Sequence, residues 1–168
     1  MRKDRKKILI LNTGGTFNKV YDEISGELVV PKDNKAIETI IKSTKVNYLE
    51  LDGIIFKDSL DITKEDRKIL KEYILGTAFQ KIIIIHGTDT MDKTAKYLSQ
   101  HILNKQIILT GSMVPFCVNT VEPTSNLMQA VGFLQNKSKN NIYISMHGHI
   151  TKHDKVFKNR EIGLFECH

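Results

Sequence analysis

The sequence predicts an α/β protein with a doubly wound, mostly parallel sheet and helices on both faces. Short apolar segments recur along the chain, helical patterns lie between them, and polar loops follow several of the apolar segments. Some of these segments are β-branched and nearly continuous, which is typical of strands covered on both faces.

Five apolar runs are expected to be strands. The run KIIIIH is the clearest, because its four successive isoleucines favour extended backbone and leave no polar face. The five expected strands are residues 8–12, 48–56, 81–86, 106–110 and 142–146.

Four intervening segments have apolar residues at helical spacing. The second begins with Thr63 and Asp66, which can form a capping box, and Gly76 is a stop signal. The helical segments include residues 36–41, 63–76, 94–102 and 127–134. Residues 18–31 differ, because a Ser25–Gly26 turn between short extended pieces predicts a mobile hairpin. We expect one domain over residues 1–168.

Composition limits the classes of function. The chain has 168 residues, 40% of them hydrophobic and 26% charged, which is typical of a soluble globular protein. The net charge is +6, but the densest basic run, Arg2 to Lys7, is expected to be a solvated flank rather than a nucleic-acid site. No apolar stretch approaches the roughly 20 residues of a membrane span, and the first is too short for a signal peptide. Cys117 and Cys167 are expected to be free thiols. We therefore expect a cytoplasmic protein with no membrane or nucleic-acid partner.

Four polar loops follow the expected strands: TGGTF (13–17), KDSLD (57–61), HGTDTM (86–91) and TGSMVP (110–115). Ligands of parallel sheets bind beyond the carboxyl ends of the strands, so these loops should converge on one crevice.

The first loop lacks both the dinucleotide-binding and the P-loop pattern. Gly14 and Gly15 allow a ligand to approach the backbone, and Thr16 offers a hydroxyl nucleophile beside amide donors. A tight turn capped by its threonines explains this loop equally well.

The HGTDTM loop favours a catalytic or binding role over a purely structural one. Thr88 and Asp89 follow a strand of isoleucines, so a hydroxyl and a carboxylate emerge together. The threonine can transfer a proton or position water, and the carboxylate can bind an amine or pair with a lysine. Helix capping by Asp89 or Thr90 explains one of these residues but not the whole motif.

Together, TGGTF and HGTDTM resemble the L-asparaginase family of threonine-nucleophile amidohydrolases. TGSMVP is similar to the family's following loop, with Val114 where arginine is usual. KDSLD takes the place of its substrate-carboxylate loop, and the segment MHGHITKHDKVFKNREIGLFE resembles the one that carries the catalytic lysine. The resemblance extends over essentially the whole chain.

The resemblance implies a role for each matched residue. Thr16 would be the nucleophile, with Tyr21 as the tyrosine that activates it. Thr88, Asp89 and Lys158 would form the second catalytic triad. Gly15, Asp58, Ser59 and Asp89 would bind substrate, with Ser59 at its α-carboxylate. The implied reaction is hydrolysis of L-asparagine to L-aspartate and ammonia through an acyl-enzyme.

Two-domain relatives have a C-terminal domain, from which a partner's carboxylate helps to bind the substrate amine. This chain resembles the short-chain form with the N-terminal domain only, so Asp89 would be the main partner of the amine and affinity would be weak. Loss of the neighbouring domain would expose apolar surface, which favours a homodimer or higher homo-oligomer.

Two alternatives remain open. One is an amidase or glutaminase with another substrate preference, and the other is a non-catalytic amino-acid-binding module. His147, His149 and His153 could suggest a metal, but no carboxylate–histidine pair at helical spacing accompanies them, and we expect solvated loop histidines. We expect no metal and no cofactor.

Overall fold

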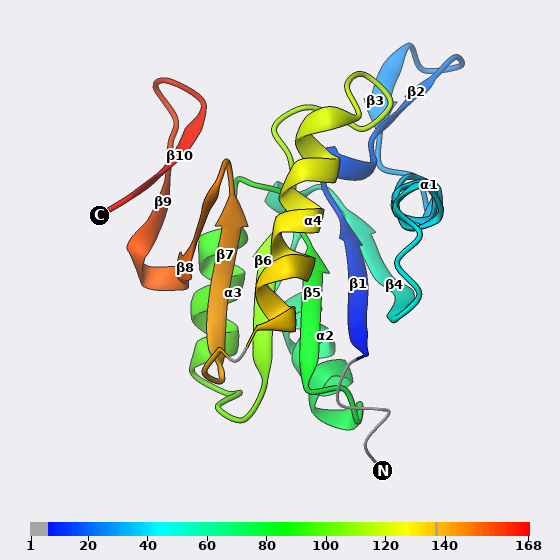
Figure 1. Cartoon of the computed structure of the whole chain (residues 1–168). Coiled ribbons are helices and arrows are strands. Elements are labelled where there is room, and N and C mark those ends of the chain that lie inside the picture. Colours follow the sequence, from blue (N-terminus) through cyan, green and yellow to red (C-terminus); the bar gives the residue numbers. More distant parts are fainter. Residues whose placement is uncertain (1–6, 137) are drawn as a thin grey trace.

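The computed structural model describes residues 7–136 and 138–168, and a six-stranded sheet lies at its centre (Figure 1). The spatial order is β4-β1-β5-β6-β7-β8. Its strands are β1 (Ile8–Gly14), β4 (Leu49–Lys57), β5 (Lys81–Ile85), β6 (Gln106–Thr110), β7 (Asn141–Met146) and β8 (His149–Lys152). Neighbours pair in parallel from β4 to β7, and β8 is antiparallel to β7. The predicted fold class is confirmed.

Helices cover both faces of this sheet (Figure 1). They are α1 (Lys35–Thr44), α2 (Lys64–Gly76), α3 (Met91–Ser99) and α4 (Val121–Gln135). Side chains of β5 alternate between two apolar cores: Ile82 and Ile84 belong to the core that includes residues of α2 and α3, and Ile83 and Ile85 to the core that includes residues of α1 and α4. Burial on both faces explains why this strand is continuously apolar.

Local signals in the sequence had their predicted effect at two places. The Thr63 hydroxyl accepts from the Asp66 amide at 3.2 Å, and the Asp66 carboxylate accepts from the Thr63 amide at 2.8 Å, which is the predicted capping box. The predicted hairpin is also present, as β2 (Val20–Asp22) paired with β3 (Glu27–Val29).

The last part of the chain has more strand than the sequence predicts. No strand is expected after residue 146, yet β8 follows a short turn, and β9 (Val156–Asn159) pairs with β10 (Leu164–Cys167). The β9–β10 pair is a separate two-stranded sheet beyond the β8 edge (Figure 1). Val156 and Phe165 are buried in one of the two cores and attach this hairpin to the rest of the molecule.

A register shift separates β1 from β4 near the carboxyl end of β1. Asn12 pairs with Gly53 and Gly14 with Lys57, so β4 has two more residues than β1 between these points. Phe56, within the shifted segment, has a positive φ of 57°. Beyond the shift, the Gly15 amide donates to the Lys57 carbonyl oxygen at 2.9 Å, so the end of β4 is attached to the loop after β1.

Among the described residues, no helix has the length and apolar character needed to cross a bilayer. The expected basic flank falls largely on residues 2–6, outside the described part of the chain. Cys117 and Cys167 are both exposed and free, as expected.

Candidate functional site

The four polar loops meet at the carboxyl edge of the sheet, as predicted. A Cβ on Gly15 would lie 2.4 Å from the Gly87 nitrogen, and a Cβ on Gly87 would lie 2.6 Å from the Ser59 Cβ. A Cβ on Gly111 would lie 2.3 Å from the His86 carbonyl oxygen. Because these contacts leave no space for side chains, glycine is what allows the loops to converge.

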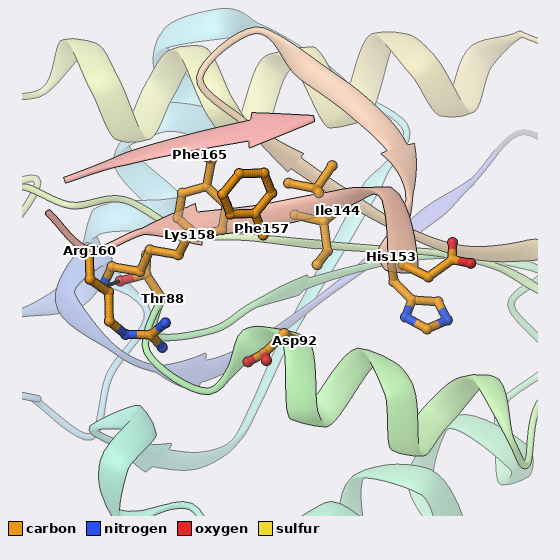
Figure 2. Close-up of a pocket in the computed structure, with 10 residues that line it drawn as sticks. Thr88, Asp92, Ile144, His153, Phe157, Lys158, Arg160 and Phe165 are labelled. Carbon is orange, nitrogen blue, oxygen red and sulfur yellow. Dashed lines mark hydrogen bonds between the residues drawn. The ribbon is translucent and has the colours of Figure 1, made fainter. Parts of the chain in front are cut away.

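Lys158 reaches this edge from β9. Its Nζ donates to the Thr88 hydroxyl at 2.9 Å (Figure 2). The same Nζ donates to Asp89 Oδ1 at 2.7 Å. The Lys158 side chain is only 10% exposed, and Thr88 is buried. Arg160, further along the hairpin, donates to the Asp89 carbonyl oxygen at 2.9 Å. The structure therefore brings together the three residues of the expected second triad.

The two threonines of the first loop have different surroundings. The Thr13 hydroxyl donates to the Ile85 carbonyl oxygen at 2.7 Å, which ties β1 to β5. Thr16 is half-buried, and its hydroxyl forms no hydrogen bond with any other residue described. Among the described residues, the Thr16 hydroxyl therefore has no hydrogen-bonding role in the fold.

Two asparagines that sequence analysis did not single out hold this loop. Asn12 Oδ1 accepts from the Gly14 amide and from Asn18 Nδ2, both at 2.9 Å, and Asn18 Nδ2 also donates to the Gly14 carbonyl oxygen. Both asparagines are buried. The polar residue at the end of an otherwise apolar strand, Asn12, was the available signal.

The backbone amides of the first loop are not equally free to donate to a ligand. The Gly15 amide donates to the Lys57 carbonyl oxygen at 2.9 Å, so it cannot serve a ligand without breaking that bond. Within the described residues, the Thr16 and Thr88 amides have no acceptor. Both amides are therefore free to donate to a ligand next to the Gly15–Gly87 contact.

Tyr21 is not brought to the other candidates. It lies on β2 and is 63% exposed, and its hydroxyl lies 4.0 Å from where a Cβ on Gly26 would be, which places it over its own hairpin turn.

Asp58 and Ser59 lie where β4 ends. Burial disfavours the Asp58 carboxylate, but hydrogen bonds from Lys19 and from the Leu60 and Ser59 amides outweigh it and hold its pKa below the ordinary value. Asp58 also pairs with Lys19 at 2.7 Å. Buried Ser59 accepts from the Asp89 amide at 3.2 Å, and its hydroxyl proton has no acceptor among the described residues. That proton is therefore available to a ligand.

The first residue of the HGTDTM loop, His86, is buried and holds the loop through hydrogen bonds. His86 Nδ1 lies 2.7 Å from the Gly87 carbonyl oxygen, and Nε2 lies 2.8 Å from the Thr94 hydroxyl, which accepts from Arg67 Nε at 2.9 Å. Burial lowers the pKa of His86 to about 4, and the nearby Arg67 charge acts in the same direction. His86 is therefore neutral near pH 7, donating from Nδ1 and accepting at Nε2.

A cavity of about 170 Å³ lies beside Lys158 (Figure 2). Its lining includes Thr88, Asp92, His153, Lys158 and Arg160, together with apolar residues of β7, β9 and β10. Thr16, Ser59 and Asp89 are not part of this lining. The cavity therefore adjoins only the lysine side of the candidate site.

The expectation of solvated loop histidines is wrong for His147. Its ring is half-buried. Nε2 lies 2.9 Å from Glu122 Oε1, and Nδ1 accepts from the Phe165 amide. In the part of the chain that the structure describes, no group of three histidine, cysteine, aspartate or glutamate side chains could hold a metal.

Residues 7–163 match the family model described as "Asparaginase, N-terminal". Among curated proteins, an L-asparaginase of Thermococcus kodakarensis is 30% identical over 162 residues, which cover 94% of this chain and 49% of that protein. L-asparaginase 1 of Escherichia coli K12 is 26% identical over 169 residues, again with 49% of the relative covered. The chain spans about half the length of the curated relatives it matches.

Solved structures of L-asparaginases also resemble this chain, again over about half of their own length. The thermostable L-asparaginase from Thermococcus kodakarensis superimposes with a TM-score of 0.82 at 28% identity, covering 96% of this chain and 51% of that one. A probable cytoplasmic L-asparaginase from Campylobacter jejuni also has a TM-score of 0.82, at 26% identity, covering 96% and 53%.

Proposed function

Because the chain belongs to the asparaginase family, we propose that it hydrolyses the side-chain amide of L-asparagine to give L-aspartate and ammonia. The observation that carries the proposal is the Lys158–Thr88–Asp89 contact, placed one residue from the junction of Gly15 with Gly87. A hydroxyl, an amine and a carboxylate thus lie next to the loop that presents Thr16, which is a suitable set for acyl transfer.

In the proposed reaction, the Thr16 hydroxyl oxygen attacks the side-chain amide carbon and gives up its proton to a base. The amide oxygen becomes an oxyanion, to which the Thr16 and Thr88 amides can donate. The carbon–nitrogen bond then breaks, and the nitrogen takes a proton and leaves as ammonia. Water attacks the resulting ester, which releases aspartate and returns the proton to Thr16.

Lys158 and Thr88 are proposed to move protons in these steps. The lysine amine is nearly excluded from solvent and donates to the Thr88 hydroxyl, so a proton can pass between them without bulk water. Asp89 orients the amine by accepting at Oδ1. The activating tyrosine is proposed to be Tyr21, whose exposed position requires the β2–β3 hairpin to move toward Thr16 when substrate binds.

Asp89 and Ser59 are proposed to hold the α-groups of the substrate. Asp89 Oδ2 accepts no hydrogen bond from the described residues and can accept from the α-amine, while the Ser59 hydroxyl can donate to the α-carboxylate. Asp58 and Gly15 then shape this subsite through the Lys19 pair and the contact with Gly87. With one carboxylate for the amine, we expect weak affinity.

The proposal extends to assembly and compartment. Val20, Ile24 and Leu28 expose apolar side chains on the β2–β3 hairpin, which supports a homo-oligomer. Light scattering after size exclusion measures its mass.

A cytoplasmic location is proposed by similarity to the Campylobacter jejuni protein.

The test measures ammonia released from asparagine, glutamine and simple amides by the wild type, Thr16→Val and Thr16→Ser. Valine keeps the shape of threonine without its hydroxyl, so turnover of asparagine should fall by about three orders of magnitude or more, whereas serine should retain part of it. Near-normal activity of Thr16→Val would exclude Thr16 as nucleophile. Turnover of another amide instead of asparagine would support a broader amidase, and saturable asparagine binding without ammonia would support a binding module.

A further inference from the structure

Glu122, in the first turn of α4, holds the loop that follows β6. Its Oε1 accepts from the Met113 amide at 2.8 Å, and its Oε2 accepts from the Val114 amide at 3.0 Å. The same Oε1 lies 2.9 Å from His147 Nε2. One carboxylate thus joins the loop after β6 to the turn after β7.

His147 continues this connection to β10. Its Nδ1 accepts from the Phe165 amide at 3.2 Å, so Nε2 is the ring nitrogen that donates to Glu122. The backbone of His147 has a positive φ of 51°, and its amide donates to Asn126 Oδ1 at 3.1 Å. A non-glycine residue held in this region is stabilised by its surroundings, and such positions are common at functional sites.

Phe165 is the residue directly opposite Lys158 in the β9–β10 ladder. The His147 contact therefore fixes the partner strand at the level of the lysine. The hairpin needs such fixing, because its two strands form a sheet of their own and an isolated pair of strands is marginally stable. Packing of Val156 and Phe165 attaches the hairpin, but apolar packing is non-directional, whereas a hydrogen bond sets distance and angle.

We propose that Glu122 and His147 are positioning residues that set the place of Lys158 by holding β10 at Phe165. The inference rests on the proposed function for its effect on rate. It adds two side chains that do not contact Thr88, Asp89 or Thr16 through any described hydrogen bond. They act through the lysine, since misplacing a reacting group by about 1 Å can lower a rate a hundredfold.

The kinetic test compares the full chain with His147→Ala, His147→Asn and the control His149→Ala. We expect His147→Ala to lower kcat about tenfold to a hundredfold, with KM changed by less than about threefold. Asparagine can accept from the Phe165 amide and tolerates positive φ, so His147→Asn should recover much of the rate. His149 lies two residues away, and His149→Ala should have the wild-type rate.

A double-mutant cycle separates positioning from general damage to the fold. In a Lys158→Met background, His147→Ala should cause no further loss of rate, because the residue through which it acts is gone. An equal loss in both backgrounds would overturn the proposal, and so would a kcat of His147→Ala within twofold of the wild type.

Amide hydrogen exchange gives a readout that does not depend on activity. Exchange across residues 156–167 should accelerate at least tenfold in His147→Ala, while exchange in β6 should match the wild type. If the wild type released no ammonia, the proposed function would fail, but this result would still decide whether His147 holds the hairpin. Unchanged exchange in residues 156–167 would overturn the positioning role by itself.

Discussion

The backbone of Gly15 lies against the backbone of Gly87, so closely that a Cβ on Gly15 would be 2.4 Å from the Gly87 nitrogen. These residues precede Thr16 and Thr88, so the spacing of the two threonines depends on this contact.

Gly15→Ala should separate the first loop from the HGTDTM loop. We expect kcat to fall at least a hundredfold, and the free energy of unfolding to fall by about 1–3 kcal/mol, because a methyl group must displace backbone. Urea unfolding and ammonia release measure the two effects. Gly26→Ala is the matched control, since Gly26 also has a positive φ, 73°, but its Cβ would have no neighbour nearer than 4.0 Å. Equal effects of the two variants would show that backbone strain, and not the contact, matters.

Lys158→Met should remove the amine and keep much of the apolar stem. We expect kcat/KM to fall about 10²–10⁴-fold, the range for loss of a general acid or base, with the far-ultraviolet spectrum unchanged. Lys155→Met, an exposed lysine three residues earlier, controls for loss of one positive charge. A reduction below about threefold would remove Lys158 from the proton path.

Tyr21→Phe should leave stability unchanged but lower the rate. The hydroxyl is exposed and bonds to none of the described residues, so the free energy of unfolding should change by less than about 0.5 kcal/mol. If the hairpin closes on substrate, kcat should fall at least tenfold. A wild-type kcat would mean that another group activates Thr16.

Stability should fall between pH 6.5 and pH 4 because of His86. The pKa of His86 is about 4 in the folded protein, against an ordinary value of 6.5, chiefly because the ring is buried. Below pH 6.5 the unfolded chain takes up a proton that the folded chain does not, so this contribution is complete above pH 6.5 and declines as the pH falls toward 4, by about 3 kcal/mol.

His86→Asn should reduce this pH dependence when urea unfolding is measured at pH 7, 6, 5 and 4. The exposed residue His101 provides the control, and His101→Asn should keep the wild-type slope. Parallel slopes for the wild type and His86→Asn would contradict the assignment of a neutral, buried His86.

The central sheet was predictable because its signals are local. Four isoleucines in β5 can only be buried on both faces, and the Thr63–Asp66 capping box fixes the start of α2. Lys158 was found through its resemblance to a family segment, and not through spacing, because the chain is rich in lysine. Its contact with Thr88 spans 70 residues and has no local signature.

The C-terminal part was less predictable for a physical reason. Strands β8, β9 and β10 have four residues each, and polar residues interrupt their apolar pattern. These strands are therefore too short for their alternation of apolar and polar residues to be recognised. His147 depends on partners 25 residues before it and 18 residues after it, which no motif in the sequence connects.

The two extra residues in β4 have a consequence for the position of Ser59. Pairing with β1 resumes at Gly14 and Lys57, so the bulge absorbs both residues and the end of β4 stays level with the end of β1. Ser59, two residues after Lys57, lies close to Gly87 just beyond β5, on the other side of β1. The place of this serine is thus set by the pairing that follows the bulge and not by the length of the strand that precedes it.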